Sequence, residues 1–275
     1  MIAPTTVQRR RASVRDAFAA FLRRDLRVAI SYKIPFILEI AAIVFTVLTY
    51  IFVSKLISPG RVPGGYFAFV LIGLTVSGFL GAGVYQLGSN LRNEQIQGTL
   101  EALLASGVPI GGLAGGMAAY PFVSALWSAV IYVVVGALAG ARAEPGANWL
   151  LALSALGIGA ISFVAIGLVG AALVLIFRRA AAATGWLVAV LSLAGGELFP
   201  TALLPGWFRA LADLSPYTQT LRLIRSAVLE AGGWADGAST LFILAVMALG
   251  YGGIGIGALA LGLRHARRTG SLGQY

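Results

Sequence analysis

The residues of this chain that could carry out chemistry are few, and their types exclude several kinds of site. Cysteine is absent and His265 is the only histidine, so thiolate catalysis, a His-based metal site and a Ser-His-Asp triad all lack essential groups. The two lysines, Lys33 and Lys55, follow Tyr and Ser rather than the glycine of a phosphate-binding loop. We therefore predict that the chain is not an enzyme and has no catalytic, metal or nucleotide site. An intramembrane enzyme is the least favoured alternative.

Two carboxylates fall in strongly apolar surroundings, where an acidic side chain is costly unless it is paired or hydrated. Glu39 lies near the start of the first apolar stretch, and we expect it at headgroup level, paired with Lys33 or an earlier arginine. Glu197 precedes a proline-rich segment, where it could line a cavity or form an ion pair. A partner for it would come from one of three later arginines, Arg209, Arg222 and Arg225.

The clearest local pattern is the polar segment 94–106, which lies between two apolar stretches. Its charged and amide side chains fall on one helical face and its leucines on another: Glu94, Gln97 and Glu101 against Leu100, Leu103 and Leu104. This spacing predicts a short amphipathic helix. Such a helix is either a connector at the membrane surface or a lever that docks into a soluble subunit and passes its movement to the spans.

Long uncharged stretches define the elements that must position these groups. Of the 275 residues, 59% are hydrophobic and 11% are charged, which is too apolar a composition for a soluble protein of this size. Each uncharged stretch reaches the roughly 20 residues needed to span a bilayer. These stretches are 64–91, 102–141, 145–177 and 237–263.

The apolar stretches predict an all-α integral membrane protein with six transmembrane helices. Their expected ranges are 34–56, 66–88, 117–140, 149–177, 184–197 and 238–263. The fifth is short for a crossing, and prolines interrupt the segment 198–229 that follows it. We expect this external segment to be re-entrant, with two short helices at membrane depth, because irregular backbone survives there only against protein or a wet cavity.

Both ends of the chain are basic. Residues 1–33 are expected to form a tail and, from residue 14, an amphipathic interfacial helix; residues 34–263 form the transmembrane domain and 264–275 a second tail. Fourteen of the twenty Lys and Arg residues fall on the side that holds both termini. We predict that both termini are cytoplasmic, that the first apolar stretch is retained, and that the net charge of +10 faces membrane lipids rather than nucleic acid.

Three segments, in this order along the chain, resemble the ABC-2 type permease family. The amphipathic helix occupies the place of that family's interfacial helix, and 94–106 resembles its Gly-Thr-Leu-Glu coupling segment. The family usually places proline directly after the serine of this segment, whereas Gly107 and Val108 intervene here. The third segment is similar to the family's external motif, and its matching residues are Pro200, Leu204, Pro205, Trp207, Pro216, Tyr217, Thr218 and Arg225.

The resemblance implies the permease subunit of an ATP-binding-cassette exporter, which pairs with a second permease subunit, as a homodimer or with a related chain. Two copies of a separate ATPase subunit would bind ATP and Mg, so this chain needs no cofactor of its own. The cargo would be an amphiphile: a drug, natural product, lipid or lipid-linked glycan. The residues expected to contact the ATPase are Glu94, Gln97, Gly98, Thr99, Leu100, Glu101 and Leu104, with Arg23 and Arg24 on the amphipathic helix.

The resemblance also implies a route for the cargo along spans 2 and 5, in the cytoplasmic membrane of a bacterium or archaeon. Its expected path residues are Phe79, Tyr85, Glu197 and Phe199. The main alternative is a secondary transporter or channel driven by an ion gradient, a class that often has repeated halves and ion sites at the midplane. The sequence shows no clear internal repeat and no midplane series of Asp, Glu or His, so it favours the ATP-driven permease.

Overall fold

The computed structural model describes residues 13–57, 62–105, 107–176 and 180–269, and within these ranges the regular structure is helical, with no strand. The predicted helical fold is therefore confirmed for the described part of the chain. Four features of the prediction lie outside the described residues: the tail before residue 13, Ser106, the Arg178-Arg179 pair and the last six residues.

Five stretches of the described residues are long and apolar enough to cross a membrane. They are α2 (Lys33–Leu56), the continuous stretch Tyr66–Ile96, α6 (Ile110–Leu138), α7 (Trp149–Ile176) and α11 (Trp234–Thr269). The second stretch comprises α3 (Tyr66–Gly81), the π-helix η1 (Ala82–Gln86) and α4 (Leu87–Ile96), so it runs eight residues past the predicted end at Gly88. The last helix continues through residues that the sequence placed in the C-terminal tail.

The fifth predicted span, 184–197, is not confirmed, so neither is the expected count of six. The corresponding helix, α8 (Ala180–Ala194), has 15 residues, and at 1.5 Å per residue it is about 22 Å long. A bilayer core is about 30 Å thick. The chain turns directly after α8 at Gly196, where φ is +77°, a conformation that favours glycine and ends the helix.

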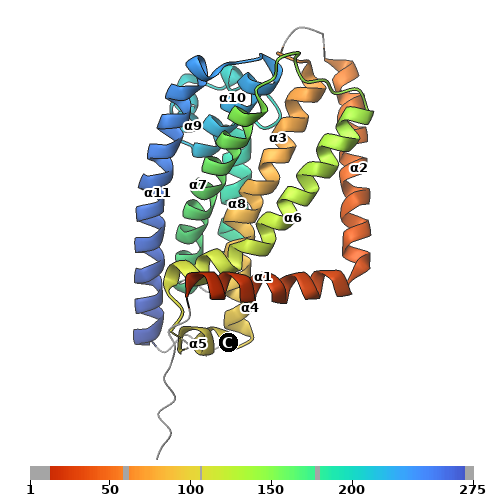
Figure 1. Ribbon diagram of the computed structural model, residues 1–275. Helices are drawn as coiled ribbons and strands as arrows, with labels where there is room; N and C mark the ends of the chain where they lie inside the picture. The colour runs from red at the N-terminus through yellow and green to blue at the C-terminus, as the bar shows by residue number, and fades with distance from the viewer. Residues whose placement is uncertain (1–12, 58–61, 106, 177–179, 270–275) are drawn as a thin grey trace, which may run out of the picture.

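Helix α1 (Val14–Ser31) lies across the foot of the bundle, nearly perpendicular to α2 (Figure 1). Its first turn is closed by a capping box, in which the amide of Asp16 donates to the hydroxyl of Ser13 at 3.1 Å. The buried ring of Phe21 packs α1 on α6 at Gly116, where an added Cβ would lie 2.5 Å from that ring. The absence of a side chain at Gly116 therefore lets the Phe21 ring lie directly against the backbone of α6.

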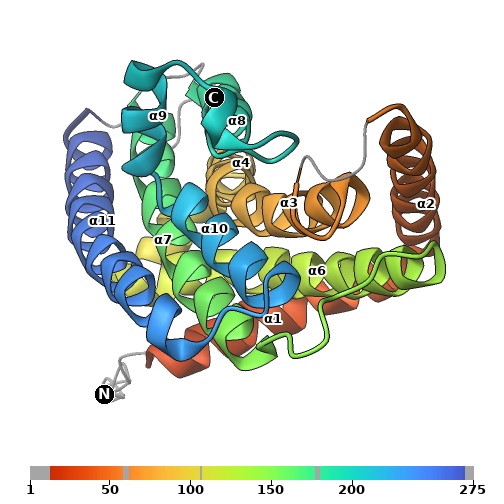
Figure 2. The same ribbon diagram turned by 90° about the horizontal axis from the view of Figure 1, so that it is seen from above.

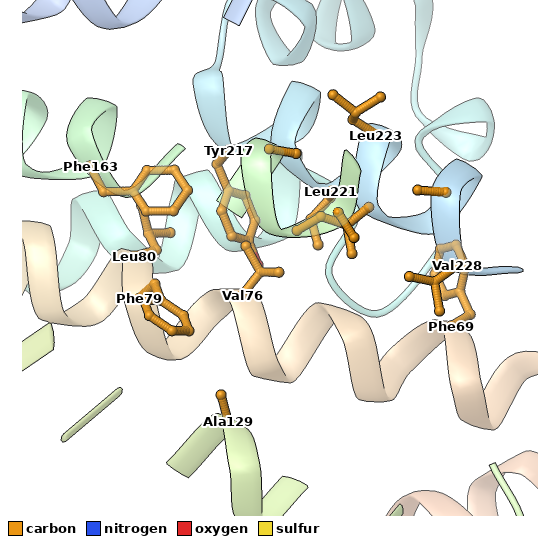
Figure 3. Close-up of a cluster of buried hydrophobic side chains, with 14 of the residues drawn as sticks. Phe69, Val76, Phe79, Leu80, Ala129, Phe163, Tyr217, Leu221, Leu223 and Val228 are labelled. Carbon is orange, nitrogen blue, oxygen red and sulfur yellow. The ribbon is translucent and has the colours of Figure 1, made fainter. Parts of the chain in front are cut away.

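Helix α7 is the centre of the bundle, with α10, α11, η1 and α4 around it (Figure 2). It touches the π-helix so closely that a Cβ at Gly167 would lie 1.8 Å from the carbonyl oxygen of Gly83. Above this point a buried cluster joins α3, α7 and α10 (Figure 3), where the rings of Phe163 and Tyr217 lie 5.9 Å apart. Span 2 is therefore packed along much of its length against the centre of the bundle.

The segment after α8 forms short helices at the end of the bundle opposite α1 (Figure 1). They are η2 (Thr201–Leu203), α9 (Gly206–Asp213) and α10 (Pro216–Leu229). Proline begins both of the longer ones, because Pro205 is the N-cap of α9 and Pro216 is the first residue of α10. Helix α10 is largely buried against α3 and α7, whereas much of α9 is exposed.

Candidate coupling site

One ion pair joins the helix at the foot of the bundle to the end of span 2. Nη1 of Arg24 on α1 lies 2.7 Å from Oε1 of Glu94, in the last turn of α4. The other carboxylate oxygen of Glu94 accepts a hydrogen bond from the hydroxyl of Thr99, the first residue of α5 (Thr99–Ala105). The side chain of Glu94 is only 7% exposed. This one carboxylate therefore ties together α1, α4 and α5.

The guanidinium of Arg24 is held by two further contacts on its own helix. Its Nε donates to Asp25 at 2.8 Å, and it lies 5.0 Å from the ring of Phe21. Burial lowers the pKa of Arg24, but the hydrogen bonds to Asp25 and Glu94 outweigh that effect and raise its pKa above the ordinary value. Its neighbours therefore favour the charged form of Arg24, the form that pairs with Glu94.

The segment 94–106 is divided by a turn, which corrects the prediction of a single helix. Helix α4 ends at Ile96, and the amide of Gly98 donates to the carbonyl of Gln95 at 3.0 Å. Gly98 has φ +70°, and a glycine in this conformation commonly ends a helix. Glu94 therefore belongs to span 2, and only Thr99 to Ala105 form the separate helix between spans.

The turn divides the expected ATPase contacts into buried and exposed groups. Leu100 is fully buried in a cluster with leucines of α4, α6 and α7, and Leu104 is partly buried beside it. Glu94 is buried by its ion pair and Arg24 is half-exposed. The exposed residues are Gln97, Gly98, Thr99 and Glu101, with Arg23 exposed on α1.

A polar cavity of about 500 Å³ adjoins the ion pair, between α1, α4 and α6. Span 2 supplies a row of amide side chains to its wall, Gln86, Asn90, Asn93 and Gln97. Sequence reasoning missed this row, although its spacing of four, three and four residues places it on one helical face. Asn90 also donates to the carbonyl of Met117 at 3.0 Å and so fixes α4 on α6.

At the opposite end of the bundle, Arg225 of α10 holds the chain after α8. Its guanidinium donates to the carbonyls of Gly196 at 2.8 Å, Glu197 at 2.9 Å and Phe69 at 3.0 Å. It also lies 3.4 Å from the Phe69 ring centroid. Arg225 thus meets the backbone of Glu197, and the hydroxyls of Ser77, Ser192 and Tyr217 surround the Glu197 carboxylate.

The other two candidate partners of Glu197 hold the outer helices in place. Arg222 forms an ion pair with Asp213 at the end of α9. The guanidinium of Arg209 donates to the carbonyls of Thr201 at 3.2 Å and Leu204 at 3.3 Å. Three arginines of the outer segment therefore fix its helices to each other and to α3.

The expected path residues differ in their access to solvent. Phe79 is buried beside Phe122, with ring centroids 6.1 Å apart, so its ring is not accessible in this conformation. Tyr85 is exposed on the π-helix, and Glu197 and Phe199 are partly buried. The ring of Phe79 therefore needs a different conformation to meet a substrate, whereas that of Tyr85 does not.

The external motif combines buried anchors with exposed residues. Pro216, Tyr217 and Thr218 are buried in α10, and the Tyr217 hydroxyl lies 3.4 Å from the carbonyl oxygen of Gly73, to which it donates. Trp207 and Pro205 are exposed, whereas Pro200 and Leu204 are partly buried. The motif therefore attaches α10 to α3 and leaves the tryptophan on the surface.

Glu39 has a different partner from the one expected. The hydroxyl of Ser128 on α6 donates to its Oε1, and within the described part of the chain Glu39 forms no ion pair with Lys33 or an arginine. The Glu39 carboxylate therefore has a hydrogen-bond donor where it lies between α2 and α6. Sequence reasoning could not identify Ser128, which is 89 residues away along the chain.

Comparison with known proteins finds one family whose model covers most of these elements. The model of a family described as ABC-2 type transporter matches residues 16–229, from α1 to the end of α10. Nodulation protein J of Sinorhizobium fredii (strain NBRC 101917 / NGR234) is 29% identical over 197 residues, which are 68% of this chain and 72% of that protein. The matched range contains Arg24, Glu94 and Arg225.

Proposed function

The chain belongs to the ABC-2 type transporter family, and on that premise we propose that it is the permease subunit of an ATP-driven exporter. It is a multi-pass membrane protein and the membrane component of an ABC transporter. In the proposed assembly two permease subunits form a homodimer, and two copies of a separate ATPase subunit bind ATP and Mg. Both termini and α1 lie on the cytoplasmic side.

The observation that carries the coupling proposal is the connection among α1, α4 and α5 at Glu94. An ATPase subunit would dock on the exposed residues Gln97 and Gly98 of the turn, on Glu101 of α5 and on Arg23 of α1. Leu100 anchors α5 in the core, so a push on α5 moves the end of span 2. The Arg24–Glu94 pair then carries the same movement to α1.

The proposed cargo is an amphiphile that leaves the cytoplasm or the inner leaflet along span 2 and α8. The π-helix at Ala82–Gln86 supports this route, because π-helical turns inside α-helices are frequent at functional sites. It places the exposed side chains of Tyr85 and Gln86 on the path. Gly185 of α8 faces Tyr85, with an added Cβ 3.8 Å from the ring, so α8 borders the path where this ring is exposed.

The test is coexpression of the chain with the ATPase from the same source and purification of the complex. We expect a stable complex whose ATP hydrolysis responds to the cargo. Glu101→Ala should weaken the complex, whereas Glu94→Ala should leave it assembled but reduce transport for each ATP consumed. Glu144→Ala, an exposed acid in the loop before α7, is the matched control. A purified chain that captures no ATPase contradicts the proposal.

A further inference from the structure

A second cavity, apolar and of about 510 Å³, lies at the corner where α1 meets α2, with α6 as its third wall. Its lining is mainly aliphatic and aromatic, including Leu26, Ile30, Phe36, Ile37, Val123 and Trp127. The rings of Phe36 and Trp127 stack with centroids 5.3 Å apart and form one wall. A cavity of this size and lining accommodates a hydrocarbon chain.

Two charged side chains make the two ends of this corner cavity electrostatically different. Lys33 and Glu39 both line it, and they lie six residues apart on α2, which is about 9 Å along the helix. Glu39 accepts the hydroxyl of Ser128 and so has one partner already. A phosphate in the cavity is attracted to the Lys33 end and repelled from the Glu39 end, so the charges orient an anionic amphiphile.

The surroundings of the cavity match the boundary between headgroups and acyl chains. Two of its walls belong to candidate membrane spans, and the third is the amphipathic helix α1. Arg23 and Arg27 are exposed on α1, on the same side as Ile30 of the cavity wall. Basic side chains on the helix that borders an apolar cavity attract anionic lipid headgroups to it.

We propose that the corner cavity binds an anionic phospholipid of the inner leaflet, with its phosphate at Lys33 and an acyl chain against Phe36 and Trp127. This rests on the proposed placement of α1 at the cytoplasmic membrane surface. It does not require the ATPase, so the two proposals fail separately. The bound lipid fills the angle between α1 and α2 and supports the orientation in which Arg24 reaches Glu94.

The test uses tryptophan fluorescence of the full chain in phosphatidylcholine vesicles that contain a small fraction of brominated lipid. Brominated acyl chains quench an indole that they touch. Brominated phosphatidylglycerol should quench the Trp127 component more strongly than brominated phosphatidylcholine does, by about fivefold in apparent affinity for one lysine. Trp127→Phe identifies that component by removing it.

The chain provides a matched pair of lysine variants. Lys33→Gln should abolish the preference for phosphatidylglycerol, whereas Lys55→Gln, at the other end of the same helix, should keep it. Val123→Phe should fill part of the cavity and reduce quenching of Trp127 by either lipid, without a change in charge and without a new indole. Circular dichroism establishes that each variant is folded.

Three results would overturn the lipid site. Equal quenching by the two brominated lipids would show that the cavity does not select charge. An equal effect of Lys33→Gln and Lys55→Gln would indicate general attraction to the membrane surface. The third result has two parts: neither brominated lipid quenches Trp127, and the chain cross-links as a dimer through this corner. Together these would show that a second copy of the chain covers the cavity.

Discussion

Replacing Arg24 by alanine should separate α1 from the turn between α4 and α5. The change removes the guanidinium 2.7 Å from Glu94 and leaves that carboxylate, 7% exposed, with the Thr99 hydroxyl. Breaking a buried ion pair from one side costs about 3–5 kcal/mol, and an exposed pair contributes about 0–1 kcal/mol. Because the Arg24 side chain is 51% exposed, water can replace part of its interaction with Glu94, and we expect the free energy of unfolding to fall by about 2 kcal/mol.

This loss is measurable as a shift in the thermal unfolding midpoint of the purified chain. For a protein of this size, about 2 kcal/mol corresponds to a decrease of about 4–8 °C. Arg23→Ala is the matched control, because Arg23 is the neighbouring exposed arginine of the same helix, and it should change the midpoint by about 1 °C or less. The double variant with Glu94→Ala should show a coupling energy of about 1–2 kcal/mol between the two positions.

Two outcomes would refute this reasoning. A coupling energy near zero would mean that Arg24 and Glu94 stabilise the protein independently, although their atoms are in contact. Equal shifts for Arg24→Ala and Arg23→Ala would mean that the positive charge of α1, rather than the ion pair, is responsible.

Three further substitutions test other parts of the structure. Gly98→Ala should cost about 1 kcal/mol in the unfolding free energy, because alanine is strained at φ +70°. Gly167→Ala should greatly reduce the yield of monodisperse protein in size-exclusion chromatography, because its Cβ would lie 1.8 Å from a carbonyl oxygen of the π-helix. Its control is Gly157→Ala on the same helix, where an added Cβ has no neighbour within 4 Å, and this variant should keep the yield unchanged. Arg225→Lys should lower the thermal midpoint, because an ammonium cannot satisfy three carbonyls in a fixed fork. Arg222→Lys, at an exposed ion pair of the same helix, should have little effect.

Much of the helical architecture could be predicted from hydropathy, because each uncharged stretch had to become a long helix. Hydropathy did not predict where α8 ends. Residues 184–197 are apolar enough for a span, but Gly195 packs on Tyr217 and Gly196 turns the chain toward the outer segment. A hydropathy pattern shows neither feature, because Tyr217 comes from another helix and the turn at Gly196 is a matter of backbone conformation rather than polarity.

The π-helix and the amide row of span 2 show a second limit. A π-helical turn shifts the face of every later residue, so a period of 3.6 read through residues 82–86 misplaces them. The row begins at Gln86, the last residue of the π-helix, and its other members follow in α4 and the turn after it, where the spacing is regular. The amide side chains recur at helical spacing in the sequence. The pattern is not obvious there, because it begins in an apolar span and ends in the segment predicted to contact the ATPase.

The two acidic residues of the coupling segment illustrate why burial had to be known before roles could be assigned. In the sequence Glu94 and Glu101 fall on the same polar face, and both fit an ATPase contact equally well. In the structure Gly98 places them on different helices, so Glu94 faces α1 inside the protein and Glu101 faces outward. A docking residue must be exposed and a residue that transmits movement must be held. In the proposed function the same segment serves both tasks because a turn divides it, and a substitution that straightened this turn should reduce coupling even with every charge retained.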